Sequence, residues 1–225
     1  MSQALFNYPG QAAFGRVLPK NKIYEYATPS AALKARFVAE VEQIVWQYKL
    51  SPETINLPAR AAAPEIQVFG ITLKTPELSE PVLRCIDQSI PFPIFYQLGY
   101  GKKMKVVAAY KRPSEADATR WVVDAYFESP WAAADAERTA LPVALDMVGL
   151  YEQMLRRLMA EPPRKGETLK EQVERQVRIR STQAECRKIE ARLQKEKQFN
   201  RKVEINATLR QLKSEIEQLV GREGI

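Results

Sequence analysis

The sequence predicts an α+β fold: a mainly antiparallel four-stranded sheet with packed helices, followed by a C-terminal α-helical coiled-coil hairpin. Short runs rich in β-branched and aromatic residues lie between residues 66 and 127, which is typical of strands. Apolar residues with helical spacing occur before, between and after these runs. From Glu167 to Val220 the chain has no Gly and no Pro, and a narrow apolar stripe runs among charged residues, which indicates paired helices.

Residues 1–30 contain several prolines and glycines, which predict irregular chain with one short helix. Thr28 stands directly before Pro29, so a capping hydroxyl precedes a proline at the first helical position. We expect a helix from there to about Tyr48, because its apolar residues share one face: Leu33, Phe37, Val41, Ile44, Val45 and Tyr48. The segment Ser51-Pro52-Glu53 predicts one further helical turn.

Alternating β-branched residues predict a strand from Ile66 to Leu73. Thr75-Pro76-Glu77 then predicts the start of a second helix, with Leu78, Val82, Cys85 and Ile86 on its buried face. Pro91 and Pro93 end this helix.

Three more strands are expected at residues 94–98, 104–110 and 121–127. The segment Gly99–Lys102 is a good hairpin turn, and short connections favour antiparallel neighbours. A strongly apolar segment from about Leu141 to Leu158 predicts the last helix of the globular part.

The clearest boundary in the chain is the segment 161–166, which holds two prolines, two basic residues and a glycine. It divides the chain into a globular domain over residues 1–160 and a helical arm over 167–225. Thr168, followed three residues later by Glu171, forms a capping box at the start of the arm.

The arm carries two apolar stripes that differ in phase. Its last leucines and isoleucine step by three and four residues, whereas Cys186, Ile189 and Leu193 follow their own register, so the phase breaks within residues 197–200. A turn there folds two helices against each other, which we favour, and a stutter in one long helix is the alternative. The predicted interaction seam comprises Cys186, Ile189, Leu193, Phe199, Leu209, Leu212, Ile216 and Leu219.

The positive charge of the chain belongs to the arm. The net charge is +7; residues 1–163 hold 18 Lys and Arg against 17 Asp and Glu, and residues 164–225 hold 16 against 10. A basic helical arm favours a polyanion or an acidic protein surface as partner, and a merely solvated helix is the alternative.

The residue composition excludes several kinds of catalytic and metal site. The chain has no histidine, which removes the Ser-His-Asp and Cys-His nucleophiles and the commonest transition-metal ligand. Its two cysteines lack metal-site or disulfide-framework spacing. We therefore predict no catalytic residues, no metal and no cofactor. The N-terminus lacks the pattern of a signal peptide, and no apolar run approaches a membrane span, so we expect a cytoplasmic protein without a membrane partner.

Basic and aromatic residues gather on the last three predicted strands, where cations can hold phosphates and rings can stack on bases. Alternation places Lys105 and Lys111 on one face and Tyr110 on the other, which favours the alternative of a sheet with one solvated face. The candidate nucleic-acid-binding residues of strands and arm are Lys102, Lys103, Lys105, Lys111, Arg112, Arg120, Arg187, Lys188, Arg192, Lys195, Arg201 and Lys202.

A carboxylate site is a weaker hypothesis. Glu65 and Asp124, with Glu40, Glu42 and Glu128 and a lysine at 74 or 105, would form a Mg²⁺-dependent nuclease centre, although the usual spacing on strands is missing. The glycines around Tyr100 lack the spacing of a phosphate-binding loop, so no nucleotide site is predicted.

Four segments together resemble a bacterial family of unknown function, DUF4391: Leu18–Tyr24, Trp46–Leu57, Ala108–Arg112 and Lys195–Glu204. The resemblance covers nearly the whole chain and supplies no catalytic residues. It implies genes encoded beside helicases and DNA methyltransferases in restriction-like or anti-phage clusters.

We therefore expect a non-catalytic accessory subunit that docks on a helicase or methyltransferase through the arm. A direct nucleic-acid-binding module is the second hypothesis, and a Mg²⁺ nuclease is the third. The narrow apolar stripe also permits pairing with a second copy of the chain.

Overall fold

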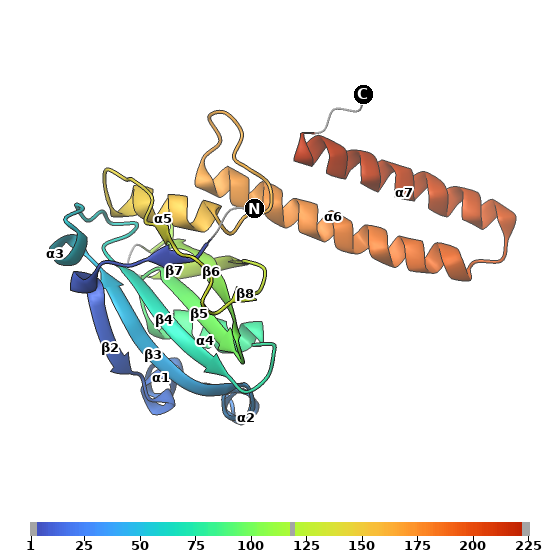
Figure 1. Cartoon of the computed structure of the whole chain (residues 1–225). Coiled ribbons are helices and arrows are strands. Elements are labelled where there is room, and N and C mark those ends of the chain that lie inside the picture. Colours follow the sequence, from blue (N-terminus) through green and yellow to red (C-terminus); the bar gives the residue numbers. More distant parts are fainter. Residues whose placement is uncertain (1–3, 118–119, 222–225) are drawn as a thin grey trace. The chain divides into compact units, whose positions relative to one another are not determined.

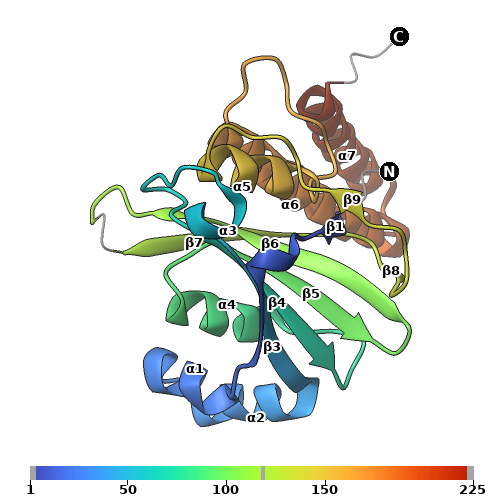
Figure 2. The ribbon, with the colours of Figure 1, turned by 60° about the vertical axis from the view of Figure 1, so that its left-hand side comes forward.

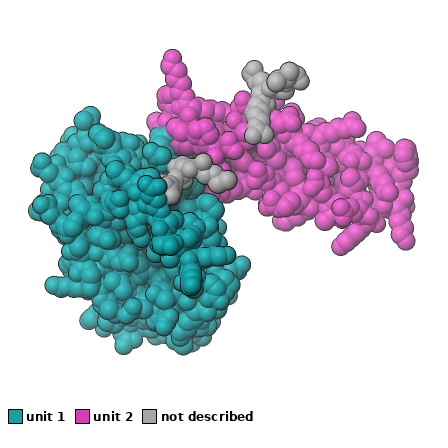
Figure 3. All heavy atoms as spheres, viewed as in Figure 1, with its two compact units in different colours: residues 1–159 teal, residues 160–225 magenta. Residues whose placement is uncertain are grey.

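The computed structural model describes residues 4–117 and 120–221 and divides into two compact units, residues 1–159 and residues 160–225 (Figure 3). Each unit is described by itself below. Among the helices so described, none combines the length and the apolar character that a membrane-spanning helix needs.

The described residues of the first unit form a seven-stranded mixed sheet in the order β2-β3-β4-β5-β6-β7, with β8 beside β6 (Figures 1 and 2). All neighbours are antiparallel except β4 and β5, which are parallel and joined through the helix α4. The strands are β2 (Ala13–Val17), β3 (Val41–Leu50), β4 (Ile66–Leu73), β5 (Ile94–Tyr100), β6 (Lys103–Pro113), β7 (Trp121–Glu128) and β8 (Ala132–Ala133). Two short strands, β1 (Phe6–Asn7) and β9 (Thr139–Ala140), pair in parallel with each other.

Helices cover both faces of this sheet (Figure 2). On one face α1 (Lys20–Ala27), α2 (Ala31–Glu40) and α4 (Glu80–Ser89) bury a core that includes Phe37, Ile71 and Ile86. On the other face α5 (Met147–Arg156) packs Tyr151 edge-on against Phe95 of β5. A 3₁₀ turn, η1 (Gly10–Ala12), and the single turn α3 (Pro52–Ile55) complete the elements.

The prediction of one helix from Pro29 to about Tyr48 is wrong. The helix α2 ends at Glu40 and the chain continues directly as β3, which pairs with β2 and β4. The predicted cap is also displaced, because Ser30 accepts from Leu33 N while Thr28 ends α1 with φ +43°. Bulges interrupt the alternation of β3 twice, so its apolar residues fall at helix-like spacings.

Other expectations hold in part. Mixed α/β structure is confirmed, but the sheet is seven-stranded and mixed among the described residues, not four-stranded and mainly antiparallel. The strand at Ile66–Leu73 and the turn at Pro52–Ile55 are confirmed. Two helices begin later than predicted: α4 is preceded by Ser79, and α5 by Asp146, whose carboxylate accepts from Gly149 N at 2.9 Å.

The described part of the second unit consists of two helices, α6 (Leu169–Lys195) and α7 (Phe199–Val220), which confirms the predicted C-terminal helices (Figure 1). The break between them covers residues 196–198, close to the phase change in the apolar pattern.

Candidate interaction surface

The start of the second unit is held by a capping box, as the sequence predicts. Thr168 Oγ1 accepts from Glu171 N, and Glu171 Oε2 accepts from Thr168 N at 2.9 Å. The backbone N–H groups of these two residues have no hydrogen-bond partner within the helix, so each side chain accepts the hydrogen bond of the other residue's N–H. The first turn of α6 is therefore fixed by local sequence.

An arginine on α6 joins both ends of this unit. Arg175 Nε and Nη2 donate to the two carboxylate oxygens of Glu167 at 2.6 and 2.8 Å, and Nη2 also donates to Pro162 O. Its Nη1 donates to Leu219 O, at the C-terminal end of α7. Arg164 Nη2 donates to the same carbonyl at 2.8 Å. Cations thus satisfy the carbonyl groups that the last turn of α7 leaves unpaired.

Ion pairs along the helices show that α6 and α7 are antiparallel. Arg178 pairs with Glu215 at 2.5 Å, and further along α6 Glu190 pairs with Lys213 at 3.0 Å. In the turn, Glu196 Oε1 accepts from the backbone N–H of residues 197 and 198, so an acidic side chain closes it.

The predicted seam is placed unevenly. Cys186 and Leu209 are buried, whereas Ile189, Leu193, Leu212, Ile216 and Leu219 are half-buried. Ile205, which is not in the predicted seam, is buried one turn before Leu209. Phe199 is 77% exposed and takes no part in this packing.

Phe199 and Val203 form an exposed apolar pair at the start of α7, which we call the tip pair. Val203 is 53% exposed and lies four residues after Phe199, so both side chains are on one face of the helix. At about 100° per residue, that face is turned by about 120° from the one that carries Ile205 and Leu209. Such exposure of a large aromatic residue marks a candidate contact surface.

Exposed cations lie on α6 and α7 on both sides of the turn before the tip pair. They are the arm residues of the predicted nucleic-acid set: Arg187, Lys188, Arg192, Lys195, Arg201 and Lys202. Among the residues that the structure describes, none of the six forms an ion pair with a neighbour. Glu196, in the turn, is close to two of them: besides its backbone hydrogen bonds, the charges of Arg201 and Arg192 lower the pKa of its carboxyl, so the group is only partly neutralised.

The basic residues of the sheet are mostly neutralised. Lys105 pairs with Glu128 at 2.7 Å, Arg112 with Asp124 at 3.2 Å and Arg120 with Asp117 at 3.4 Å. Of the strand residues in the predicted set, Lys102 and Lys103, in the turn before β6 and at its start, are exposed and have no such pair among the described residues. The predicted basic surface on the strands is thus smaller than the sequence indicates.

The family model of a domain of unknown function, DUF4391, matches residues 6–216. That range spans most of the chain. The chain belongs to the DUF4391 family. Neither a curated protein nor a solved structure matches it.

Lys111 of this DUF4391 chain cannot serve as a nucleic-acid contact, which corrects its place in the predicted set. Its side chain is fully buried: Nζ donates to the backbone carbonyls of Asp87, at 2.6 Å, and Ile90, and lies 3.3 Å from Asp87 Oδ1. Burial lowers the pKa of the Lys111 ammonium and raises the pKa of the Asp87 carboxyl. The face of β6 that alternation assigned to the lysines is the face that α4 covers, not a solvated one.

Sequence reasoning missed the other members of this buried polar group. Tyr126 Oη donates to Asp87 Oδ2 at 2.6 Å. Tyr151 Oη accepts from Lys111 N at 2.8 Å and donates to Ala109 O at 3.0 Å, at the irregularity in the pairing of β6 with β7. Asp87 one residue after Ile86, inside an apolar helix pattern, was the available signal. Its satisfied hydrogen bonds give the group a structural role.

The carboxylates of the nuclease hypothesis are not brought together. Glu65 pairs with Lys49 at 2.7 Å, Glu40 accepts from Ser79 N, and Asp124 pairs with Arg112. Within the described residues there is no group of three or more acidic or cysteine side chains placed to hold a metal ion.

Proposed function

We propose that this DUF4391 protein is a non-catalytic accessory subunit of a bacterial DNA-directed system, restriction-like or anti-phage. It docks on a helicase or methyltransferase through the tip of its C-terminal helices. The observation that carries the proposal is the tip pair, Phe199 and Val203, both exposed at the start of α7. The type of partner follows from the family resemblance.

The tip pair favours a protein partner because its chemistry is that of an interface anchor. Aromatic residues dominate binding energy when they enter a pocket on a partner and are surrounded by polar groups that exclude water. Full burial of a Phe or Val side chain contributes about 1.5–3 kcal/mol through the hydrophobic effect. The outside of a DNA duplex presents phosphates and sugars, which offer no comparable apolar surface.

The cations around the tip pair determine the complementary surface. Lys195 and Lys202 flank the turn and are exposed. Opposite charges across an interface speed association and exclude wrong partners. The docking site on the partner is therefore an apolar pocket with an acidic rim.

Binding of the full-length chain to the helicase or methyltransferase encoded beside its gene tests the proposal. The variant Phe199→Ala with Val203→Ala should weaken binding about 100-fold, since two anchors of this size contribute about 3 kcal/mol. The matched control is Val143→Ala with Leu145→Ala, two residues that are each 92% exposed in the first unit. The control should bind as the wild type does.

Circular dichroism should show unchanged helix content in both variants, because the truncated side chains are exposed. Wild-type affinity in the tip variant, or an equal loss in the control, would refute docking through the tip pair.

Nucleic-acid binding is the second candidate function, because the six exposed cations of the arm have no ion-pair partner among the described residues. Binding to a duplex, whose bases are stacked inside, differs from protein docking in depending mainly on charge. A polyanion should bind the tip variant as well as it binds the wild type, since no positive charge is lost.

A further inference from the structure

The hairpin formed by β5 and β6 ends in an exposed aromatic ring beside two lysines. Tyr100, the last residue of β5, is 39% exposed, and in the described part of the chain its ring stacks on no other ring and lies under no cation. Gly101 follows with φ +57°, which a two-residue hairpin turn needs at its first central position. Lys102 and Lys103 come next, and both are exposed. We call Tyr100, Lys102 and Lys103 the hairpin end.

The pairing of the two strands places the ring beside a cation. Tyr100 lies directly opposite Lys103 in the antiparallel ladder, and side chains in such positions share a face, with Cβ atoms about 5 Å apart. Lys105 is two residues further along β6, so alternation puts it on the same face. Its ammonium lies 5.2 Å from the ring centre of Trp131. One face of the sheet thus holds two rings and two lysines close together.

The lysines of the hairpin end are available to an anion. Neither forms an ion pair within residues 4–117 and 120–221, although Asp135 follows Ala134, whose N–H donates to Lys102 O at 2.9 Å. Lys74, which is also exposed, directly follows β4. Because β4 and β5 are parallel, their carboxyl ends lie at the same edge of the sheet, and Lys74 adds a third cation to that edge.

A ring with adjacent cations matches the chemistry of a nucleic-acid strand, in which bases stack on aromatic faces and phosphates pair with ammonium groups. A protein partner is less well matched. Along β5 and β6, which are described in full, no large hydrophobic residue other than Tyr100 is exposed, and lysines are depleted from the apolar centres of protein interfaces. A duplex keeps its bases stacked inside, so the ring can reach a base only in a single strand.

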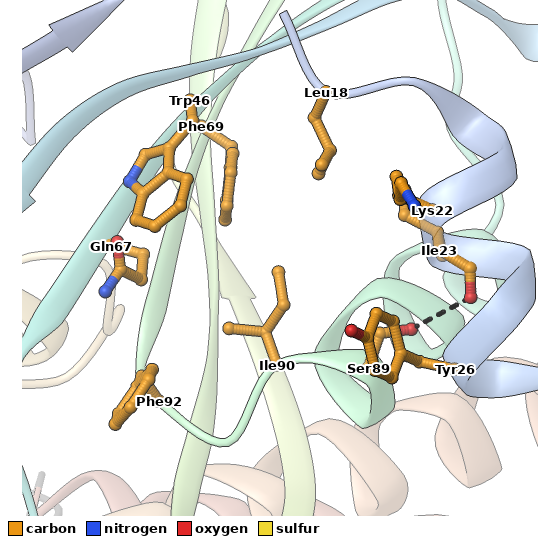
Figure 4. A pocket seen from close by; sticks show the side chains of 10 residues that line it. All are labelled: Leu18, Lys22, Ile23, Tyr26, Trp46, Gln67, Phe69, Ser89, Ile90 and Phe92. Carbon is orange, nitrogen blue, oxygen red and sulfur yellow. Dashed lines mark hydrogen bonds between the residues drawn. The ribbon is translucent and has the colours of Figure 1, made fainter. Parts of the chain in front are cut away.

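The apolar pocket of the first unit offers no comparable site for a nucleotide (Figure 4). It encloses about 160 Å³ between α1, β3, β4 and the segment after α4, and Trp46, Phe69 and Phe92 form part of its walls. The ammonium of Lys22, which lines the pocket, is paired with Glu25 at 3.0 Å. A base in this pocket would therefore find no unpaired cation in the lining for its phosphate.

We propose that the hairpin end binds single-stranded nucleic acid, with a base stacked on Tyr100 and the neighbouring phosphates held by Lys102 and Lys103. Two adjacent cations can hold successive phosphates of one strand, so the ligand is an oligonucleotide and not a single nucleotide. The site lies in the first unit and depends neither on the tip pair nor on the cations of the arm. DNA and RNA share the base and phosphate chemistry that the site uses.

Fluorescence anisotropy of the full-length chain with a labelled oligothymidine, and with an abasic strand of the same length, tests the stacking. The abasic strand has the same phosphates and no bases. The wild type should bind oligothymidine about tenfold more tightly, because one base gains an aromatic face. Tyr100→Ala should remove this difference and Tyr100→Trp should retain it. Phe199→Ala and Tyr26→Ala are the controls, since these rings are 77% and 75% exposed elsewhere, and both should retain the difference.

The same assay at several salt concentrations tests the phosphate contacts. Lys102→Gln with Lys103→Gln should reduce the logarithmic salt slope by about 1.4, because each phosphate contact to a single strand contributes about 0.7. Lys34→Gln with Arg36→Gln, two exposed cations of α2, should leave the slope unchanged. An oligouridine should show the same dependence on Tyr100, and its affinity relative to oligothymidine distinguishes RNA from DNA as the strand that the site prefers.

Equal binding of oligothymidine and the abasic strand to the wild-type chain would overturn the stacked base, and no binding of either strand at low salt would overturn the site. Loss of the difference in Phe199→Ala, with the difference retained in Tyr100→Ala, would place the base on the arm and overturn the proposal as well. The wild-type comparison of the two strands decides even if a variant fails to fold.

Discussion

Arg175 and Glu167 form a nearly buried pair that ties together the two ends of the helical unit. Their side chains are 6% and 9% exposed, and two guanidinium nitrogens reach the two carboxylate oxygens at 2.6 and 2.8 Å. The same guanidinium also donates to Leu219 O, in the last turn of α7. Because residue 167 precedes α6 and residue 219 lies in the last turn of α7, one side chain closes the open end of the helix pair.

Arg175→Met should destabilise the helical unit by about 3 kcal/mol, because it leaves the nearly buried carboxylate of Glu167 unpaired. Urea denaturation followed by the helical circular dichroism signal measures the loss. Arg178→Met is the matched control, since Arg178 also pairs with a glutamate but is 63% exposed. Its cost should stay below about 1 kcal/mol. If the two variants lose the same free energy of unfolding, burial does not make the Arg175–Glu167 pair more important for stability than an exposed pair.

The same pair predicts a dependence on pH. The hydrogen bond from Arg175 holds the pKa of the Glu167 carboxyl below its usual range. A lowered pKa in the folded state stabilises the protein above the unfolded value of about 4.3, and this contribution is lost as the pH falls through the folded pKa.

Glu167→Gln should therefore reduce the loss of stability between about pH 5 and pH 3, relative to the wild type. Denaturation curves at several pH values measure this slope, with Glu174→Gln, at an exposed position on α6, as the control. A wild-type slope in Glu167→Gln would exclude a role of this carboxyl in acid sensitivity.

The buried lysine of the sheet gives a third prediction. Lys111→Met should cost about 3–5 kcal/mol, since it leaves Asp87 buried without its cation. Adding Asp87→Leu to that variant should recover part of the loss, because both charges are then absent. Lys105→Met is the control, as its partner Glu128 is 59% exposed, and should cost less than about 1 kcal/mol. Chemical denaturation compares the variants, and a small effect of Lys111→Met would contradict an ionised buried pair.

A fourth prediction concerns the hydroxyl group of Tyr151. Tyr151→Phe removes the partner of both Lys111 N and Ala109 O, and should cost about 2 kcal/mol because two buried backbone groups lose a hydrogen bond. Tyr26→Phe, at a position that is 75% exposed, should change the free energy of unfolding by less than about 0.5 kcal/mol. If both variants are neutral, water replaces the hydroxyl and the site is less enclosed than its burial indicates.

Local signals in the sequence were sufficient where the structure is local. The capping box of Thr168 and Glu171, the strand Ile66–Leu73 and the break after Lys195 are all set by residues close in the chain. The strand Val41–Leu50 was missed because its bulges displace the alternation, and because its partners β2 and β4 lie elsewhere in the sequence.

The residues of the candidate site were also predicted only as far as local sequence patterns allow. Alternation assigned Lys111 to the correct face of its strand, but only the packing of α4 on that face reveals that the lysine is buried. The exposure of Phe199 likewise depends on where the turn ends and α7 begins, which the apolar pattern alone leaves open by one or two residues.

A fifth prediction separates nucleic-acid binding from protein docking. Each cation that contacts a phosphate releases counterions, so affinity for DNA falls with salt concentration by about one unit of logarithmic slope per contact. If the exposed arm cations contact DNA, the triple variant Lys188→Gln, Arg192→Gln and Lys195→Gln should reduce that slope by about three. Fluorescence anisotropy with a labelled duplex at several salt concentrations measures it.

The control neutralises Arg16, Lys34 and Arg36, three exposed cations of the first unit, and should leave the slope unchanged. Equal slopes for the two triple variants would mean that the arm attracts DNA only through net charge.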